Sequence, residues 1–194
     1  MKTRIVIADD EVIIRADIRE RLELEGYEVV GEAGDGFDAV DMCREIKPDI
    51  VLLDIKMPMM DGITAAKLIH KENPDIGIIM LTAYSDKDFV EKAAECGAMG
   101  YIVKPVEDRA LFPAIEIAVN RCREIEGIKS RLDAAEQKLS ERRVIEKAKV
   151  VLIKRNNMRE KEAYEYIRNV SMNKRKSMKD IAEIILINQK NIFE

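Results

Sequence analysis

The feature that most constrains the fold is an alternation of short apolar runs with helical patterns in the first part of the 194-residue chain. The runs are rich in Val and Ile, and several are apolar throughout, which is typical of strands covered on both faces. They span Ile5–Ala8, Tyr27–Val30, Ile50–Leu53, Ile76–Leu81 and Tyr101–Val103. Helical patterns lie near residues 12–25, 36–46, 61–72 and 86–96, and a last one begins near Asp108. Five strand–helix units predict a doubly wound α/β domain with a five-stranded parallel sheet.

Polar side chains stand where several of these strands end. They are Asp9 and Asp10 after the first strand, Asp54 after the third, Thr82 after the fourth and Lys104 after the fifth. Parallel α/β sheets bind ligands at the carboxyl ends of their strands, so all five are predicted to gather at one edge. Three clustered carboxylates repel one another, so a hard divalent cation such as Mg²⁺ is expected among them. With a Lys and a hydroxyl nearby, this arrangement suits in-line phosphoryl transfer to Asp54.

Each of these residues also has an ordinary structural interpretation. A single Asp after a strand usually caps a helix, and a Lys-Pro pair usually forms a turn. The joint pattern nevertheless favours a phosphoryl-acceptor site. A metal-dependent phosphatase is disfavoured because Ile55 and Lys56 follow Asp54, where such an enzyme usually carries a second acid as general acid.

The segments IVIADDE, VLLDIKMPMMDG, LTAYSD and YIVKP closely resemble the motifs of two-component receiver domains, over residues 1 to about 122. The resemblance implies a flavodoxin-like domain that accepts a phosphoryl group on Asp54 from a sensor histidine kinase. It implies no enzyme beyond an intrinsic autophosphatase activity at most. It also implies that Mg²⁺ is held by Asp10, Asp54 and the backbone carbonyl of Lys56, with Asp9 in the outer acidic pocket.

The same resemblance implies further roles at this edge. Lys104 contacts the phosphoryl group, and Thr82 and Tyr101 form a switch pair that reorients after phosphorylation. The Lys104–Pro105 bond corresponds to the cis peptide of the family, and X–Pro bonds lose little free energy by being cis. We expect phosphorylation to promote dimerisation through the Tyr101 side of the domain and the helix that follows.

The composition changes after Pro113. From Ala114 to Val151 there is no further Pro and only one Gly, and Glu, Lys, Arg, Ala and Leu are abundant. The apolar residues recur with the spacing of a two-stranded coiled-coil seam. They are Ile115, Ala118, Cys122, Ile125, Leu132 and Leu139. Because Lys129 and Glu136 interrupt this seam, we expect a short coiled-coil linker over residues 114–145 that is too weak for a permanent dimer. The alternative is a solvated helix that packs on its own domain.

The C-terminal part differs in charge from the rest of the chain. Residues 1–140 carry 19 Lys and Arg against 29 Asp and Glu, a net charge of −10, whereas residues 141–194 carry 14 against 8, a net charge of +6. Apolar residues at helical spacing, and an S-x-x-D helix start at Ser177, predict three short helices in an all-α bundle. The basic charge favours a polyanionic partner, while a solvated basic surface and a protein-binding surface are the alternatives.

Short segments of this part resemble the ANTAR domain of transcription antitermination regulators, from residue 141 to about 189. They are Ala148-Lys149, Glu162-Ala163-Tyr164, Ile167-Arg168, the turn Met172-Asn-Lys-Arg-Lys and Asp180-Ile-Ala-Glu-Ile-Ile. The resemblance implies that residues 141–194 form a three-helix RNA-binding domain, which binds paired hairpins of nascent RNA and prevents a terminator from forming. Arg159 stands where the family often has a capping Ser or Thr, so Asn157 or Met158 is expected to begin the second helix.

The basic residues of this domain are the predicted RNA contacts. Candidates for phosphate and base contacts are Lys149, Arg168, Lys174, Arg175 and Lys176. Tyr164 either stacks on a base or packs in the bundle core, and Asn173 either reads a base edge or caps a helix. A DNA-binding regulator with a helix-turn-helix is the alternative, although residues 181–187 are mostly apolar and a recognition helix needs exposed polar side chains.

The remaining features concern the compartment. The longest apolar runs are of strand length, so no segment is expected to span a membrane. Cys43, Cys96 and Cys122 are widely separated and odd in number, which indicates core residues in a reducing cytoplasm. We therefore expect a cytoplasmic response regulator whose partners are a sensor histidine kinase, structured RNA and a second copy of the chain.

Overall fold

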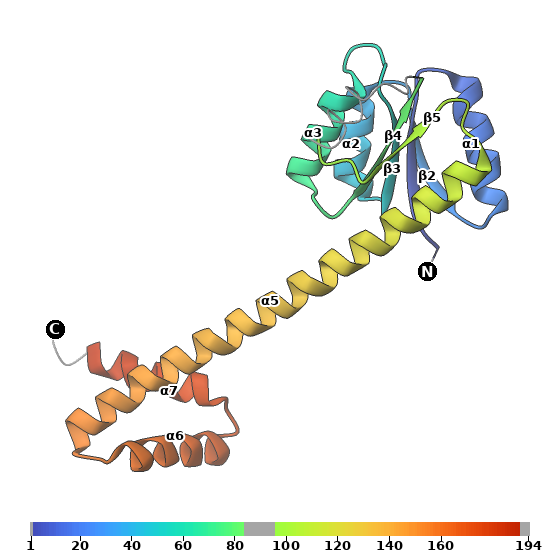
Figure 1. The fold of residues 1–194 in the computed structure, drawn as a ribbon. Coiled ribbons are helices and arrows are strands. Elements are labelled where there is room, and N and C mark those ends of the chain that lie inside the picture. The colour runs from blue at the N-terminus through green and yellow to red at the C-terminus, as the bar shows by residue number, and fades with distance from the viewer. Residues whose placement is uncertain (1, 84–95, 191–194) are drawn as a thin grey trace. The chain divides into compact units, whose positions relative to one another are not determined.

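The computed structural model describes residues 2–83 and 96–190 (Figure 1). The chain divides into two compact units, Met1–Gly127 and Ile128–Glu194, called the N-terminal and the C-terminal unit below. The helical pattern predicted near residues 86–96 lies outside the described residues except for Cys96. Among the described residues, none of the helices combines the length and the apolar character that crossing a membrane requires.

The N-terminal unit is built on a five-stranded parallel sheet with the strand order β2-β1-β3-β4-β5. The strands are β1 (Arg4–Ala8), β2 (Glu28–Ala33), β3 (Ile50–Asp54), β4 (Gly77–Thr82) and β5 (Gly100–Val103). The direction of winding reverses at β1, because β2 lies on one side of it and the later strands lie on the other. This confirms the predicted doubly wound fold. The carboxyl ends of β1 and β3 are neighbours, with Ala8 paired to Leu53.

Helices cover both faces of this sheet. On one face lie α1 (Val12–Leu24) and the beginning of α5 (Asp108–Asn156), and on the other lie α2 (Gly36–Ile46) and α3 (Gly62–Glu72) (Figure 1). Successive strand residues point to opposite faces, so each strand contributes to two separate cores. This is why runs such as IVLL at the start of β3 are apolar throughout and fully buried.

Strand β2 is longer than the apolar run that predicted it. The run ends at Val30, whereas the strand continues to Ala33, with Glu32 paired to Ile7 and Ala33 paired to Ala8. Gly and Glu are poor strand formers, so the strand predicted from the side-chain pattern stops before Gly31. The backbone ladder to β1 extends the strand because it needs only N–H and C=O groups.

The beginning of α5 packs into the core of the N-terminal unit. Ile115 is 0% exposed and Ala118 is 1% exposed, among residues such as Leu52 of β3. Cys122 is half-buried, with its Sγ 3.6 Å from the Sδ of Met99. The prediction that Ile115 and Ala118 line a dimer seam is therefore wrong, and the alternative of a helix packed on its own domain holds there. Over two turns, the spacing of a coiled-coil seam does not differ from that of an ordinary buried helix face.

The C-terminal unit is a bundle of three helical segments, as predicted. The end of α5 provides the first segment, followed by α6 (Glu160–Lys174) and α7 (Met178–Lys190). Its buried core consists of Ala148, Leu152, Ala163, Ile167, Ile181 and Ala182. The first segment is part of a helix that begins at Asp108, rather than a separate short helix.

Both helix starts in this bundle are fixed by side chains. Before α7, the Asp180 N–H donates to Ser177 Oγ at 3.0 Å and the Ser177 N–H donates to Asp180 Oδ2 at 3.2 Å, which is the predicted capping box. Helix α6 begins at Glu160, with the Arg159 N–H donating to Glu162 Oε2 at 2.8 Å. The expectation that Asn157 or Met158 begins this helix is wrong, because Asn157 has a left-handed φ of 51° that no right-handed helix contains.

Two neighbouring isoleucines of α5 allow its packing on the N-terminal unit to be tested. We expect Ile115→Ala to lower the free energy of unfolding of this unit by about 2–4 kcal/mol, because it leaves a cavity in a closed core. Ile117 is 60% exposed, so Ile117→Ala should change that free energy by less than about 0.5 kcal/mol. Hydrogen exchange of the β1 and β3 amides in the full-length chain measures both effects. Equal effects of the two substitutions would contradict this packing.

Candidate functional site

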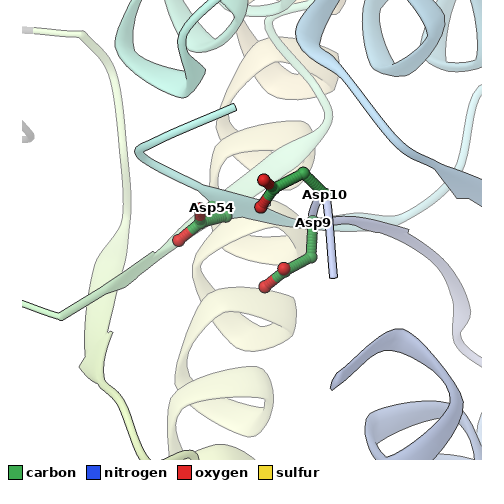
Figure 2. A group of neighbouring side chains, drawn as sticks. All are labelled: Asp9, Asp10 and Asp54. Carbon is green, nitrogen blue, oxygen red and sulfur yellow. The ribbon is translucent and has the colours of Figure 1, made fainter. Parts of the chain in front are cut away.

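Three carboxylates converge at the carboxyl edge of the sheet, as predicted. Asp9 and Asp10 follow β1, and Asp54 is the last residue of the adjacent strand β3. One oxygen atom from each residue lies within 4.8 Å of one oxygen atom of the others, and Figure 2 shows the three side chains grouped together. Asp9 and Asp54 are buried, whereas Asp10 is exposed. The cluster therefore has a protected side and a side open to solvent.

Lys104 provides a positive charge to two of these carboxylates. Its Nζ lies 2.7 Å from Asp9 Oδ2 and 3.0 Å from Asp54 Oδ1. Its backbone N–H donates to the Thr82 carbonyl at 2.7 Å, which fixes the chain directly after β5 against the end of β4. Burial alone would lower the pKa of Lys104, but the two carboxylate partners outweigh it and raise that pKa. The ammonium therefore remains charged in the site.

The contact with Lys104 does not fully compensate the negative charge of Asp54. Burial raises the pKa of its carboxyl group, Lys104 opposes that effect, and the charges of Asp9 and Asp10 add to it. Apart from Lys104, the buried Asp9 Oδ2 has no hydrogen-bonding partner among the described residues. A hard divalent cation favours oxygen ligands and would hold Asp54 in its ionised form, so the residues present fit such an ion.

The acidic cluster opens into a cleft with a volume of about 280 Å³. Its walls are formed by Asp10, Glu11, Asp54, Ile55, Lys56, Thr82, Ala83 and Lys104. The predicted residues Thr82 and Lys56 are thus placed beside Asp54, and the Lys56 N–H donates to Asp54 Oδ2 at 3.2 Å. Glu11 was not predicted, although its N–H donates to Asp9 Oδ1 at 3.0 Å. The only sequence signal for it is its place directly after the acidic pair.

The Asp61-Gly62 pair closes the loop behind Asp54. Asp61 caps α3, because its Oδ1 accepts the Thr64 N–H at 2.9 Å. A Cβ atom at Gly62 would lie 1.9 Å from the carbonyl oxygen of Asp54, so only glycine fits there. The Gly62 N–H donates to the Ile55 carbonyl at 2.9 Å. The pair therefore brings the start of α3 against the main chain of the candidate acceptor.

The predicted switch residues occupy different surroundings. Thr82 ends β4 and is 3% exposed, whereas Tyr101 lies on the edge strand β5 and is 47% exposed. In the β4–β5 ladder Tyr101 is paired with Met80, and Thr82 is paired with Val103. The Lys104–Pro105 peptide bond is cis, as the resemblance implied. One residue of the pair thus lines the cleft, and the other is half-exposed on the edge strand of the sheet.

Lys149 differs from the other predicted nucleic-acid contacts. Its Nζ lies 3.0 Å from both carboxylate oxygens of Glu146 and 2.8 Å from Glu160 Oε1, and its side chain is only 8% exposed. These ion pairs raise the pKa of Lys149 and join α5 to the start of α6. The geometry thus gives Lys149 a role in holding the bundle together.

The other basic candidates are exposed on α6 and on the turn that follows it. These are Arg168, Lys174, Arg175 and Lys176. Tyr164 is 44% exposed and lies outside the buried core. The alternative prediction, that Tyr164 packs in the core of the bundle, is therefore wrong. Tyr164, Arg168 and Met172 follow one another at intervals of four residues, which places them along one side of α6.

The turn between α6 and α7 is held by short-range hydrogen bonds. Arg175 has a left-handed φ of 51° at the C-cap of α6, and the N–H of Lys176 donates to the Ser171 carbonyl at 3.1 Å. Ser171 Oγ in turn donates to the Lys176 carbonyl at 2.6 Å. Asn173 is exposed within the last turn of α6 and is not its C-cap, so the capping alternative is not supported. The turn therefore presents its basic side chains on a fixed backbone.

Comparisons with known proteins agree with both units. The family model described as the response regulator receiver domain matches residues 5–116. The chain belongs to the response regulators. A second family model, described as the ANTAR domain, matches residues 133–186, so the receiver domain is followed by an ANTAR domain.

Individual relatives support this organisation. A transcriptional regulatory protein from Mycobacterium tuberculosis, PdtaR, is 44% identical over 183 residues, which cover 94% of this chain and 89% of that protein. A CheY-like receiver domain protein from Methanospirillum hungatei has a TM-score of 0.60 at 30% identity, covering 64% of this chain and 98% of that one. CheY from Borrelia burgdorferi, crystallised with CheX, beryllofluoride and Mg²⁺, has a TM-score of 0.57 at 30% identity, over 58% of this chain and 86% of that one.

Proposed function

We propose that this response regulator is activated by phosphorylation of Asp54, dimerises, and binds hairpins of nascent RNA to cause transcription antitermination. In this proposal residues 1–122 form the receiver domain, residues 114–145 the linker, and residues 141–194 the RNA-binding domain. The observation that carries the proposal is the convergence of Asp9, Asp10 and Asp54 around Lys104, on a chain whose C-terminal unit matches the ANTAR family.

Asp54 is the acceptor in this proposal because it is the buried carboxylate that reaches both the cleft and Lys104. One of its carboxylate oxygens bonds to phosphorus as the donor's phosphorus–nitrogen bond breaks, and the electron pair stays on the donor imidazole of the sensor histidine kinase. Lys104 faces the charge that develops on the phosphoryl oxygens, and Thr82 lies in the same cleft. Tyr101 is the partner of Thr82 in the conformational switch.

The metal in this proposal is Mg²⁺, held by Asp10, Asp54 and the Lys56 carbonyl, with Asp9 behind them. When bound, the ion neutralises charge on the phosphoryl oxygens. Asp10 is exposed at the mouth of the cluster, which suits an ion that keeps several water ligands. Support comes also from CheY of Borrelia burgdorferi, a protein of similar fold that was crystallised with beryllofluoride and Mg²⁺.

The RNA surface in this proposal lies on α6 and the α6–α7 turn. Arg168, Lys174, Arg175 and Lys176 supply phosphate and base contacts, Tyr164 stacks on an unpaired base, and Asn173 reads a base edge. Their exposure, and the stripe that places Tyr164 and Arg168 on one side of α6, support this assignment. Lys149 contributes by holding α6 on α5 rather than by touching RNA.

Dimerisation in this proposal uses the part of α5 that lies beyond the packed Ile115 and Ala118. Of the predicted seam, Ile125, Leu132 and Leu139 are 40%, 56% and 57% exposed. Within the C-terminal unit, the apolar residues of α5 that are exposed at coiled-coil spacing are Ile128, Leu132, Ala135 and Leu139. On this face Lys129 and Glu136 no longer interrupt the seam, because they lie beside it.

The charges beside this face favour a parallel arrangement of two copies. If Leu132 and Leu139 occupy position a of the heptad, Arg131 occupies position g and Glu136 occupies position e. In a parallel, in-register pair, Arg131 of each copy lies next to Glu136 of the other. Two such oppositely charged pairs form by symmetry, and the dimer also brings two RNA-binding domains to one target, which raises affinity through effective concentration.

Phosphorylation should depend on Asp54. We expect Asp54→Ala to abolish labelling by acetyl phosphate, because among the described residues Asp54 both lines the cleft and contacts Lys104, whereas Asp9 contacts Lys104 without lining the cleft. Asp41 is an exposed acid on α2, and Asp41→Ala should be labelled like the unaltered protein. Intact mass measurement after incubation with acetyl phosphate and Mg²⁺ distinguishes the variants. Full labelling of the Asp54 variant would rule out this acceptor.

RNA binding should depend on the basic residues of α6 and its turn. We expect Arg168→Ala and Lys176→Ala to weaken binding to paired hairpins, and each lost phosphate contact should lower the salt slope by roughly one. Lys67→Ala removes one exposed charge from the receiver domain and should leave the affinity unchanged. Binding is measured with phosphorylated protein against paired hairpins, single hairpins and duplex DNA over a salt series. Tighter binding to duplex DNA would replace the antitermination proposal by the helix-turn-helix alternative.

The parallel seam should respond to charge reversal. We expect Arg131→Glu or Glu136→Arg alone to weaken dimerisation roughly tenfold, because two pairs worth up to about 1 kcal/mol each become repulsive. The double variant should restore dimerisation, whereas Asp133→Arg, on the opposite side of the helix, should have no effect. Sedimentation of the full-length chain with beryllofluoride and Mg²⁺ measures the equilibrium. A double variant as weak as either single one would contradict the parallel register.

A further inference from the structure

We propose that Arg15 is a positioning residue for the Asp9–Asp10 pair, and that it thereby sets the affinity of the acidic cluster for a divalent cation. This inference rests on the proposed role of the cluster as a metal site. Arg15 lies on α1 and its side chain does not line the cleft, so it acts through the main chain of the acidic pair rather than on the reacting atoms.

The guanidinium group of Arg15 joins three elements. Its Nη1 donates to the main-chain carbonyl of Asp9 at 2.6 Å, and its Nε lies 3.5 Å from Glu32 Oε2 on β2. The Arg15 side chain is 15% exposed and that of Glu32 is 27% exposed, so solvent weakens these contacts only in part. The side chain therefore extends from α1 to the end of β1 and on to the neighbouring strand.

Each polar group of Asp9 has a partner within the N-terminal unit. Its N–H donates to the Ala33 carbonyl at 3.1 Å, and its Oδ1 accepts the Glu11 N–H at 3.0 Å. Its Oδ2 lies 2.7 Å from Lys104 Nζ. The main-chain carbonyl is the fourth group, and Arg15 is its side-chain partner. Arg15 thus fixes the part of Asp9 that the other three contacts leave free to turn.

That carbonyl belongs to the peptide bond between Asp9 and Asp10. Because a peptide group is planar, the direction of its C=O determines the direction of its N–H and the position of the next Cα. A hydrogen bond that holds the Asp9 carbonyl therefore also determines where the Asp10 side chain leaves the main chain. Asp10 is exposed and has few neighbours of its own to restrain it, so this restraint matters most for its carboxylate. Partners that orient a metal ligand typically change metal affinity by about 10–100-fold.

Arg19 provides a matched comparison on the same helix. Its Nη1 lies 2.9 Å from Glu32 Oε1 and its Nε lies 2.8 Å from Glu23 Oε1, so it contacts the same Glu32 carboxylate as Arg15. It has no contact with Asp9 among the hydrogen bonds of the described residues. Replacing Arg19 therefore removes a contact to Glu32 but leaves the hydrogen bond between Arg15 and the Asp9 carbonyl in place.

The test measures metal binding by the unphosphorylated, full-length chain. Mn²⁺ is the probe, its bound fraction is followed by electron paramagnetic resonance, and Mg²⁺ competition gives the Mg²⁺ affinity. We expect Arg15→Gln to weaken Mn²⁺ binding about tenfold, and Arg15→Lys to weaken it too, because an ammonium cannot reproduce a planar guanidinium group whose Nη1 bonds to the Asp9 carbonyl while its Nε faces Glu32. Arg19→Gln should stay within about twofold of the unaltered chain. Labelling of Arg15→Gln by acetyl phosphate should recover at saturating Mg²⁺, because Asp54 and Lys104 are unchanged.

Thermal unfolding without metal separates positioning from general stability. Arg15→Gln and Arg19→Gln each remove one contact to Glu32, so their melting temperatures should fall by similar amounts while only the first loses metal affinity. Equal metal affinities in these two variants would overturn the inference and leave Arg15 as a structural residue. If the unaltered chain bound no Mn²⁺ at all, the proposed metal site itself would be wrong. If the unaltered chain bound Mn²⁺ and was labelled on Asp54, but Arg15→Gln and Arg19→Gln bound Mn²⁺ equally, only the role of Arg15 would fail.

Discussion

Repulsion among Asp9, Asp10 and Asp54 is the constraint on which the arrangement of the receiver domain depends. Two of these carboxylates are buried, and a buried charge without a partner is strongly destabilising. Lys104 can reach them only because β5 ends at the same edge of the sheet as β1 and β3. The parallel sheet thus brings opposite charges together from distant parts of the sequence. A single ammonium between two carboxylates leaves the edge negative, which suits a site that receives a cation.

Much of this edge could be predicted because it follows from strand direction alone. The ends of parallel strands meet whatever their side chains are, so residues directly after apolar runs can be placed together from the sequence. The role of Gly62 could not be predicted in the same way. It depends on the loop after β3 returning to the Asp54 carbonyl, a close approach between backbones that no side-chain pattern records. Arg15 escaped prediction for a similar reason, since its partner is a carbonyl group.

The helical part of the chain was predicted less well, because periodicity shows that a helix has an apolar face but not what covers it. Ile115 and Leu139 belong to one predicted seam, yet the first is enclosed by the sheet and the second is exposed. A charged residue is ambiguous in the same way, because the sequence does not show which group its side chain contacts. Lys149 looked like its basic neighbours, but it is paired with Glu160, eleven residues further on, across a turn whose geometry is not apparent in the sequence. Long-range partners, rather than local preference, separate these residues.

The left-handed backbone of Arg175 has a cost for the stability of the turn. A residue with a Cβ atom is strained in this conformation, and glycine is the usual occupant of the position that follows a helix. Selection for a robust fold alone would therefore favour glycine there. The arginine that occupies this position instead adds a positive charge to the turn and accepts that strain. In the proposed RNA-binding role, low backbone strain and positive charge are therefore alternatives at this one residue.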